Sequence, residues 1–188
     1  NEPVPRIIAG SAKGRKIGAP EGTATRPTSD RAREALFSAL NSQLTSWAGR
    51  RFLDLYAGSG AVGLEAASRG ASAVVLVESH APALTALRSN IALLGFTSTS
   101  VVASSVERFA QLPAEPFDVI FADPPYDTGS SAVQSAVENL LANGAAKAGT
   151  IVVVERSKRD TTWTWPEPIT GLRNKSYGEA TFWYGQVD

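Results

Sequence analysis

The sequence predicts an α/β fold in which a Rossmann-like, mostly parallel sheet carries helices on both of its faces. Short runs of β-branched and aromatic residues alternate with segments of helical periodicity along the 188 residues, as in chains that build parallel sheets. Two of these runs end in distinctive turns, Ala57–Gly60 and Asp123–Tyr126. The carboxyl ends of parallel strands form the ligand-binding edge of such a sheet, so both turns are expected beside a crevice.

The individual elements follow in a regular order. Ser29 or Asp30 is expected to cap a first helix, with Arg31 on the side opposite its apolar residues and Arg33 at the flank. Further helices are expected between Gly60 and Gly70, from 80 to 95 and from 130 to 143. Strands are predicted at 51–56, 71–78, within 100–110, at 117–122 and 150–155, and in a closing hairpin of 171–177 and 181–186.

Composition excludes several classes of protein. The chain has no cysteine and a single histidine, His80, which excludes disulfides and thiolate metal sites and argues against a histidine zinc site or a Ser-His-Asp triad. We therefore predict no metal. No apolar run approaches the length of a membrane span, and no signal peptide precedes Val4. These features fit a cytoplasmic protein that does not bind membranes.

The net charge of zero hides a separation along the chain. Residues 1–51 carry nine Lys and Arg against four Asp and Glu, whereas residues 52–155 carry four against ten. Residues 1–25 are predicted to form a basic arm or small hairpin, and residues 26–188 the main domain. The arm would grip a polyanion through Lys13, Arg15 and Lys16. The alternative is that these residues only keep the arm soluble.

The turn after the strand 117–122 carries the strongest chemical signal. Pro124 and Pro125 cannot donate to a sheet, so they end the strand and hold the Asp123 carboxylate, the Pro124 carbonyl and the Tyr126 ring in fixed relation. Two acceptors can bind both hydrogens of an exocyclic amine on a nucleobase, and an aromatic ring can stack on an extruded base. The alternative is an ordinary Asp-Pro-Pro turn.

The first strand and its loop predict a nucleoside pocket. Gly58, Gly60 and Gly63 match the spacing of dinucleotide-binding loops, but Asp54 would repel a pyrophosphate and attract a cationic sulfonium or amine. Glu78 ends the next strand, where a carboxylate commonly accepts ribose hydroxyls. S-adenosylmethionine fits this set better than NAD. The candidate cofactor-binding residues are Asp54, Tyr56, Gly58, Ser59, Gly60, Glu78 and Ser79.

Several motifs together resemble a known family. The motifs are TRPTSDRAREALF at 25–37, DLYAGSGAVGLEAASRGA at 54–71, FADPPY at 121–126 and YGEATFWY at 177–184. With these, the chain resembles the RsmD-type family, bacterial class I methyltransferases that modify guanine N2 in 16S rRNA. The resemblance covers nearly the whole chain. It implies a seven-stranded sheet with an antiparallel last strand and a short N-terminal extension.

The same resemblance implies roles for individual residues. Gly58, Ser59, Gly60 and Glu78 would contact the cofactor, and Asp123, Pro124 and Tyr126 would hold the guanine. Arg26, Thr28 and Arg31 would lie at the rim of the active site. Many relatives place an Asp after the third strand to bind adenine, whereas this chain has Ser104 and Ser105, so Ser105 and the backbone of Val106 are expected to take over. Arg156 and Lys158 form a second candidate for phosphate contact.

The sequence as a whole predicts an S-adenosylmethionine-dependent methyltransferase acting on guanine N2 of 16S rRNA. We expect a monomer whose substrate is an assembled or assembling 30S subunit. A DNA or RNA methyltransferase acting on adenine N6 or cytosine N4 is the main alternative, although such enzymes usually add a target-recognition domain. An RNA-binding module without catalysis would not need Asp123 and Glu78.

Overall fold

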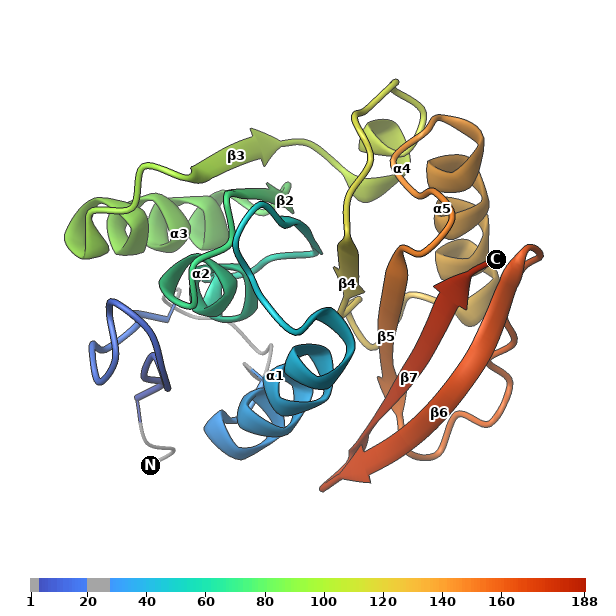
Figure 1. Cartoon of the computed structure of the whole chain (residues 1–188), viewed down its shortest axis with the longest axis horizontal. Coiled ribbons are helices and arrows are strands. Elements are labelled where there is room, and N and C mark those ends of the chain that lie inside the picture. Colours follow the sequence, from blue (N-terminus) through green and yellow to red (C-terminus); the bar gives the residue numbers. More distant parts are fainter. Residues whose placement is uncertain (1–3, 20–27) are drawn as a thin grey trace.

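The computed structural model describes residues 4–19 and 28–188. It has the predicted α/β architecture, with one seven-stranded sheet of order β3-β2-β1-β4-β5-β7-β6 (Figure 1). The strands are β1 Arg51–Leu55, β2 Ala73–Glu78, β3 Thr99–Ala103, β4 Val119–Ala122, β5 Ile151–Ser157, β6 Ile169–Tyr177 and β7 Ala180–Val187. The helices are α1 Asp30–Leu44, α2 Ala61–Ser68, α3 Ala81–Leu94, α4 Val106–Phe109 and α5 Ser130–Ala142.

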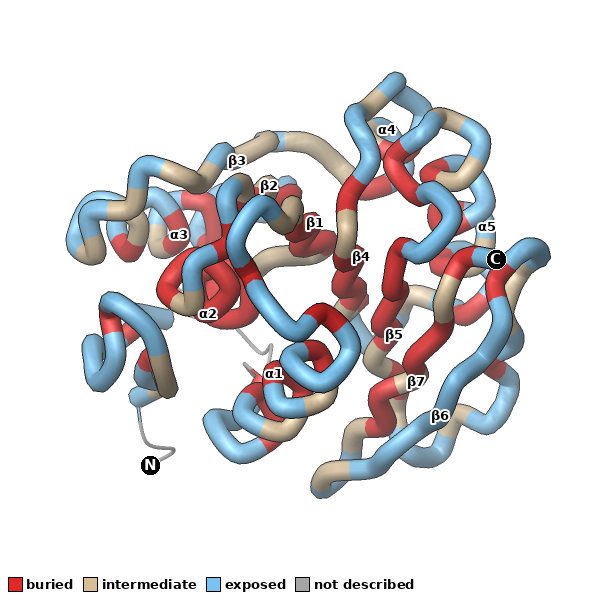
Figure 2. Tube along the Cα trace, in the orientation of Figure 1, coloured by how far each residue is buried: buried red, intermediate tan, exposed pale blue. Residues whose placement is uncertain are grey.

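Two apolar layers hold the helices to the sheet. Phe52 of β1 and Phe121 of β4 pack with α1, α2 and α3, whereas Leu53 and Ile120, the neighbouring residues in these strands, pack with α4 and α5. Successive side chains of a strand point to opposite faces, and both faces are covered here, so the central strands are apolar throughout. Figure 2 shows β4 and β5 buried along most of their length.

The carboxyl edge of the sheet is formed by parallel strands. β1 pairs with β2 and β4, β2 with β3, and β4 with β5, all in parallel. The chain order turns at β1 and β4, which is where ligands bind in open α/β sheets. The turns after these two strands therefore lie side by side.

The sheet is completed by the predicted C-terminal hairpin. β7 runs antiparallel to β5 and to β6, so the expected reversed last strand is confirmed. β6 is the edge strand, and most of its residues are exposed (Figure 2). Trp163 and Phe182 are buried in the core, as expected for aromatic residues that serve packing.

The N-terminal arm is more tightly attached than a flexible extension. Its predicted hairpin is reduced to one antiparallel bridge between Arg6 and Lys16. Ile7 and Ile17 are buried against α2 in a third apolar cluster. The arm therefore belongs to the folded body, and the division of the chain at residue 25 stays a prediction.

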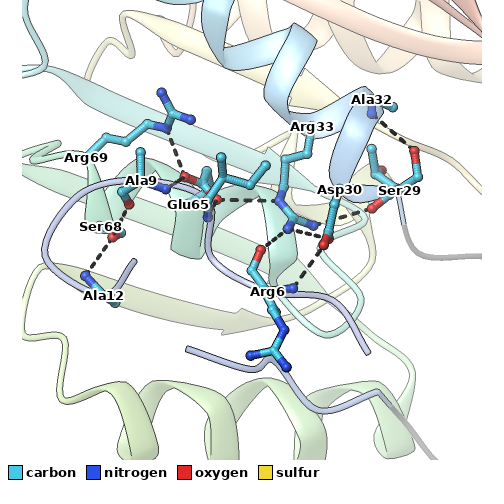
Figure 3. A network of polar contacts seen from close by, with 12 residues as sticks. Arg6, Ala9, Ala12, Ser29, Asp30, Ala32, Arg33, Glu65, Ser68 and Arg69 are labelled. Carbon is cyan, nitrogen blue, oxygen red and sulfur yellow. Dashed lines mark hydrogen bonds and ion pairs between the residues drawn. The ribbon is translucent and has the colours of Figure 1, made fainter. Parts of the chain in front are cut away.

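A buried ionic network fixes the arm, as Figure 3 shows. The Glu65 carboxylate accepts hydrogen bonds from the amides of Ile8 at 2.8 Å and Ala9 at 3.1 Å. The Arg33 guanidinium lies 3.5 Å from Glu65 and 2.8 Å from Asp30. The expected place of Arg33 at a helix flank was wrong, because its side chain is fully buried between α1, α2 and the arm.

Candidate active site

A large cavity lies at the carboxyl edge of the sheet. Its volume is about 1530 Å³, and its walls come from the start of α1, the ends of β1, β2, β4 and β5, and the β6–β7 turn. Most of the predicted site residues gather in its wall: Thr28, Arg31, Asp54, Tyr56, Gly58, Ser59, Glu78, Ser79, Ser105, Val106, Asp123, Pro124, Pro125, Tyr126 and Arg156. The shared hollow expected from the strand ends therefore exists.

The glycine loop between β1 and α2 forms one wall. Gly58 has a φ of +58°, and a side chain added there would meet open space, so glycine serves the turn and leaves room in the cavity. Gly60, at the end of the same loop, faces Leu87 of α3 instead. A Cβ atom at Gly60 would come within 2.5 Å of Leu87, so glycine is needed here for the packing of α2 against α3, and its predicted cofactor contact stays a prediction.

Glu78 is held by backbone donors beside this loop. Its carboxylate accepts from the amides of Gly58, Ser79 and His80, each at 2.8 Å. These bonds fix the carboxylate at the end of β2, where it lines the cavity. Each carboxylate oxygen has two acceptor sites, so Glu78 keeps capacity for ribose hydroxyls.

Asp54 is the most deeply buried carboxyl group of the cavity wall. It is 2% exposed and accepts a 2.8 Å hydrogen bond from the Gly63 amide. Burial raises the pKa of Asp54 to about 8, and the nearby charges of Asp123 and Glu78 act in the same direction, whereas the Gly63 bond lowers it. A cation bound here would draw off the proton.

Tyr56 marks a sharp change of direction at the end of β1. Its φ of +57° is unusual for a residue with a side chain and turns the chain into the glycine loop. Its hydroxyl group is buried and has no hydrogen-bond partner within the described residues. Burial also raises the pKa of Tyr56 to about 12. The hydroxyl is therefore a neutral polar group enclosed within the wall of the cavity.

The serine turn after β3 has a clear local role. Ser105 caps α4, and its hydroxyl accepts from the Arg108 amide at 3.1 Å. The Ser105 hydroxyl is thus already engaged, which leaves the Val106 amide as the better-placed group for an adenine edge. Both residues line the cavity.

The Asp-Pro-Pro-Tyr turn lies opposite the glycine loop. Asp123 follows the last residue of β4, and its Oδ2 accepts from the Thr28 hydroxyl at 3.4 Å. Tyr126 is 71% exposed although it lines the cavity. An aromatic ring that is not packed into the core can stack on a ligand.

Glu155 is a site residue that the sequence analysis passed over. It lies in β5 beside Asp123, because Ala122 of β4 pairs with Val154 of β5 and each carboxyl residue comes next in the chain. Phe121 and Val153 pack on the same face of the sheet, so Asp123 and Glu155, two residues further along each strand, lie next to each other on that face and both line the cavity. Burial and the Asp123 charge raise the pKa of Glu155 to about 10, and burial also raises the pKa of Asp123. The strand-end rule used for Asp123 points equally to Glu155.

The predicted substrate-binding residues outside the arm differ in whether they line the cavity. Arg26 lies outside the described residues, while Thr28 and Arg31 reach the cavity from the start of α1. Arg156 is 8% exposed and uses its guanidinium on Asp160 at 3.1 Å and the Thr128 carbonyl at 2.9 Å. These bonds show that Arg156 helps to fix the cavity wall, and its contact with a phosphate stays a prediction. Lys158 is exposed but does not line the cavity.

The cations of the arm lie away from the cavity. Lys13, Arg15 and Lys16 are exposed, and none of them lines the cavity. The arm turns at the C-terminal ends of α2 and α3, where the Ser11 amide donates to the Ser68 carbonyl and Arg15 to the Leu93 carbonyl. Any contact with a polyanion here would be made beyond the cavity, along the flank of these helices.

The cavity wall is strongly acidic. Among the described residues it carries nine carboxyl groups, three arginines and no lysine. Such a wall attracts cationic ligands and disfavours a pyrophosphate. Within the same residues, no group of three or more His, Cys, Asp or Glu could hold a metal ion, and no helix is long and apolar enough to cross a bilayer.

An open sheet of this order, with a reversed β7, a glycine loop after β1 and acidic residues at the ends of β1, β2 and β4, defines a class I methyltransferase. A model of the family described as Conserved hypothetical protein 95 matches residues 5–186. The chain belongs to this family, the RsmD-type methyltransferases that the motifs suggested.

Individual relatives agree with this membership. "Ribosomal RNA small subunit methyltransferase D" of Escherichia coli K12 is 33% identical over 94% of this chain and 87% of its own length. The protein of the same name from Haemophilus influenzae is also 33% identical, over 94% of this chain and 91% of its own. The solved structure of Escherichia coli yhhF, described as a candidate methyltransferase, is 32% identical with a TM-score of 0.85 and covers 97% of each chain.

Proposed function

We propose that the protein transfers a methyl group from S-adenosylmethionine to the exocyclic N2 amine of a guanine in 16S rRNA. The observation that supports this proposal is the shared cavity, whose wall brings together Glu78 at the end of β2 and Asp123 after β4. Relatives with the name ribosomal RNA small subunit methyltransferase D supply the substrate class. Such a substrate implies a cytoplasmic enzyme, and we expect it to act as a monomer on an assembled or assembling 30S subunit.

The residues of the cavity fit S-adenosylmethionine. Glu78 would accept the ribose hydroxyls, the Val106 amide would meet the adenine, and the open side of Gly58 would admit the ligand. Asp54 and the other carboxyl groups would attract the positive charges, and the Tyr56 hydroxyl would gain a partner. When bound, the cofactor would supply an electrophilic methyl group on a sulfonium, and it would leave as a neutral thioether once its bond from sulfur to the methyl carbon breaks.

The Asp-Pro-Pro-Tyr turn would bind the guanine. Tyr126 would stack on the extruded base, while the Asp123 carboxylate and the Pro124 carbonyl accept the two N2 hydrogens and orient the nitrogen lone pair. Positive charge develops on N2 as its bond to the methyl carbon forms, and the carboxylate stabilises it. The proton that N2 then loses passes to Asp123 and on to water.

A pair of variants tests the two halves of this proposal. Asp123→Ala should bind S-adenosylmethionine with nearly unchanged affinity but lower turnover by about 100-fold or more, since a positioning and charge-stabilising group is removed. Glu78→Ala should mainly weaken cofactor binding. Calorimetry measures the binding, and transfer of a labelled methyl group to 30S subunits or free 16S rRNA, followed by nucleoside analysis, measures the reaction. Full turnover by Asp123→Ala, or label on adenine or cytosine, would reject the proposed site or product.

A further inference from the structure

The contact between Asp123 and Glu155 is unusual because it brings together two acidic side chains. Both line the cavity, and the parallel register of β4 and β5 sets them side by side on the sheet face that carries α1. Two ionised carboxylates at adjacent strand positions of a partly buried wall would repel each other, and sharing one proton relieves this repulsion. One proton is therefore held by the pair.

The surroundings decide which group keeps the proton. Thr28 donates to Asp123, and the Arg156 charge lies near it, so both favour the ionised form of Asp123. The pKa of Glu155, in contrast, is raised to about 10 by burial and by the Asp123 charge. Within the described part of the chain, no cation or hydrogen-bond donor lowers it. Burial raises the pKa of both groups, but Asp123 has the Thr28 donor and the Arg156 cation beside it, so Glu155 is the better proton donor and Asp123 the better acceptor.

Other charged groups face the pair from neighbouring elements. Asp54 of β1 adds negative charge, and its pKa is itself raised to about 8. Glu78 lies beyond it at the end of β2, and Tyr177 and Glu179 line the opposite wall from β6 and its turn. These acids add to the cost of a second negative charge on the pair, whereas Arg31 and Arg159 of the same wall offset part of that cost.

We propose that Glu155 is a positioning residue that shares one proton with Asp123, so that the pair carries one negative charge and presents Asp123 as a fixed acceptor to the substrate amine. This inference rests on the proposed function, because it assigns Asp123 to the amine. Glu155 and Thr28 occupy part of the acceptor capacity of Asp123, which leaves the remaining lone pairs directed into the cavity.

The shared proton can be observed without turnover. Infrared spectra of the protein at pH 9 should show a protonated carboxyl band, since this pH lies above the pKa of Asp54 and below that of Glu155. Glu155→Gln should lose the band, and Asp54→Asn, the matched control, should keep it. A wild-type protein without the band at pH 9, or a Glu155→Gln variant that keeps it, would overturn the inference.

The positioning role has its own readout in the pH dependence of turnover. Glu155→Gln retains a donor and should stay within about threefold of wild type at pH 7.5, and it should lack the wild-type decline at alkaline pH. Glu155→Leu removes the donor, so Asp123 should hold a proton itself, and the acidic limb of kcat should move up by about one pH unit or more. Cofactor affinity should not change in either variant.

The outcomes separate this inference from the proposed function. An acidic limb in Glu155→Leu identical to that of wild type would overturn the positioning role. A wild-type protein that shows the band at pH 9 but methylates no guanine would reject the proposed function, while the shared proton would be supported.

Discussion

At the scale of single residues, surroundings rather than residue type set the properties of the acidic groups in the cavity. Glu78 receives three backbone amide bonds, whereas Asp54 receives one. Burial outweighs the one bond to Asp54, and the pKa of this group is raised to about 8. Asp54 pairs with Leu76, two residues before Glu78, and this deeper position within the sheet sets its pKa.

The raised pKa of Asp54 predicts a loss of stability with rising pH. Between the unfolded pKa of about 3.9 and the folded value of about 8, the folded protein holds a proton that the unfolded chain releases. The free energy of unfolding should therefore fall as pH rises through this window. Asp54→Asn removes this titration while its amide oxygen can still accept from Gly63.

Urea unfolding at pH 5 and pH 8 checks this prediction. From pH 5 to pH 8, Asp54→Asn should lose less stability than wild type, and the Asp123–Glu155 pair should contribute to the slope that remains. Parallel pH profiles for the two proteins would show that Asp54 does not keep its proton.

Sequence reasoning found some of these residues and missed others for physical reasons. Asp123 and Glu78 could be predicted because each ends an apolar strand, a local feature. Glu155 ends an apolar run too, but its importance comes from its neighbour Asp123, 32 positions earlier. Arg33 could not be placed, since its burial depends on Glu65 and the arm, which lie in other parts of the chain.

At the scale of elements, α2 connects three parts of the molecule. Its start follows the glycine loop, its Gly63 packs against Leu76 of β2 with no room for a side chain, and its Glu65 and Ser68 bind the arm (Figure 3). The position of the cavity wall at Gly58 and the position of the arm therefore depend on the same eight-residue helix.

Removing the central acid of this network should destabilise the whole protein. Glu65→Ala leaves the fully buried Arg33 without this partner and removes the acceptor of the Ile8 and Ala9 amides. The free energy of unfolding should fall by about 3–5 kcal/mol, as for other broken buried ion pairs. Urea or thermal unfolding measures the change.

Glu34 provides the matched control because it is an exposed acid on α1. Glu34→Ala should change the free energy of unfolding by no more than about 0.5 kcal/mol. An equally small change for Glu65→Ala would mean that the network does not hold the arm in place.

At the scale of the whole molecule, charge is separated in space as well as along the sequence. The cavity wall is acidic, whereas Lys13, Arg15 and Lys16 are exposed on the arm outside it. A cationic cofactor and a polyanionic RNA would thus meet different surfaces. We expect the RNA to extend from the cavity along the flank formed by the arm, α2 and α3.

The salt dependence of RNA binding tests this path. Lys13→Ala with Lys16→Ala should weaken binding and reduce the slope of log affinity against log salt by about 1 for each phosphate that the protein no longer neutralises. Lys147→Ala is the control. This exposed lysine lies in the loop between α5 and β5, at the amino ends of the parallel strands, whereas the cavity lies at their carboxyl ends. Equal slopes for the double variant and wild type would show that the arm does not bind phosphate.

The sequence by itself determined the alternation of strands and helices, the reversed last strand that its family resemblance implies, and the acidic strand ends that line the cavity. These features depend on local periodicity and on residues close together in the chain. The tertiary structure decided that Glu155 meets Asp123, that Arg33 is buried with Glu65, and that the arm's cations lie away from the cavity. Burial and proximity of this kind arise from strand order and from packing between segments far apart in the chain, which local patterns do not specify.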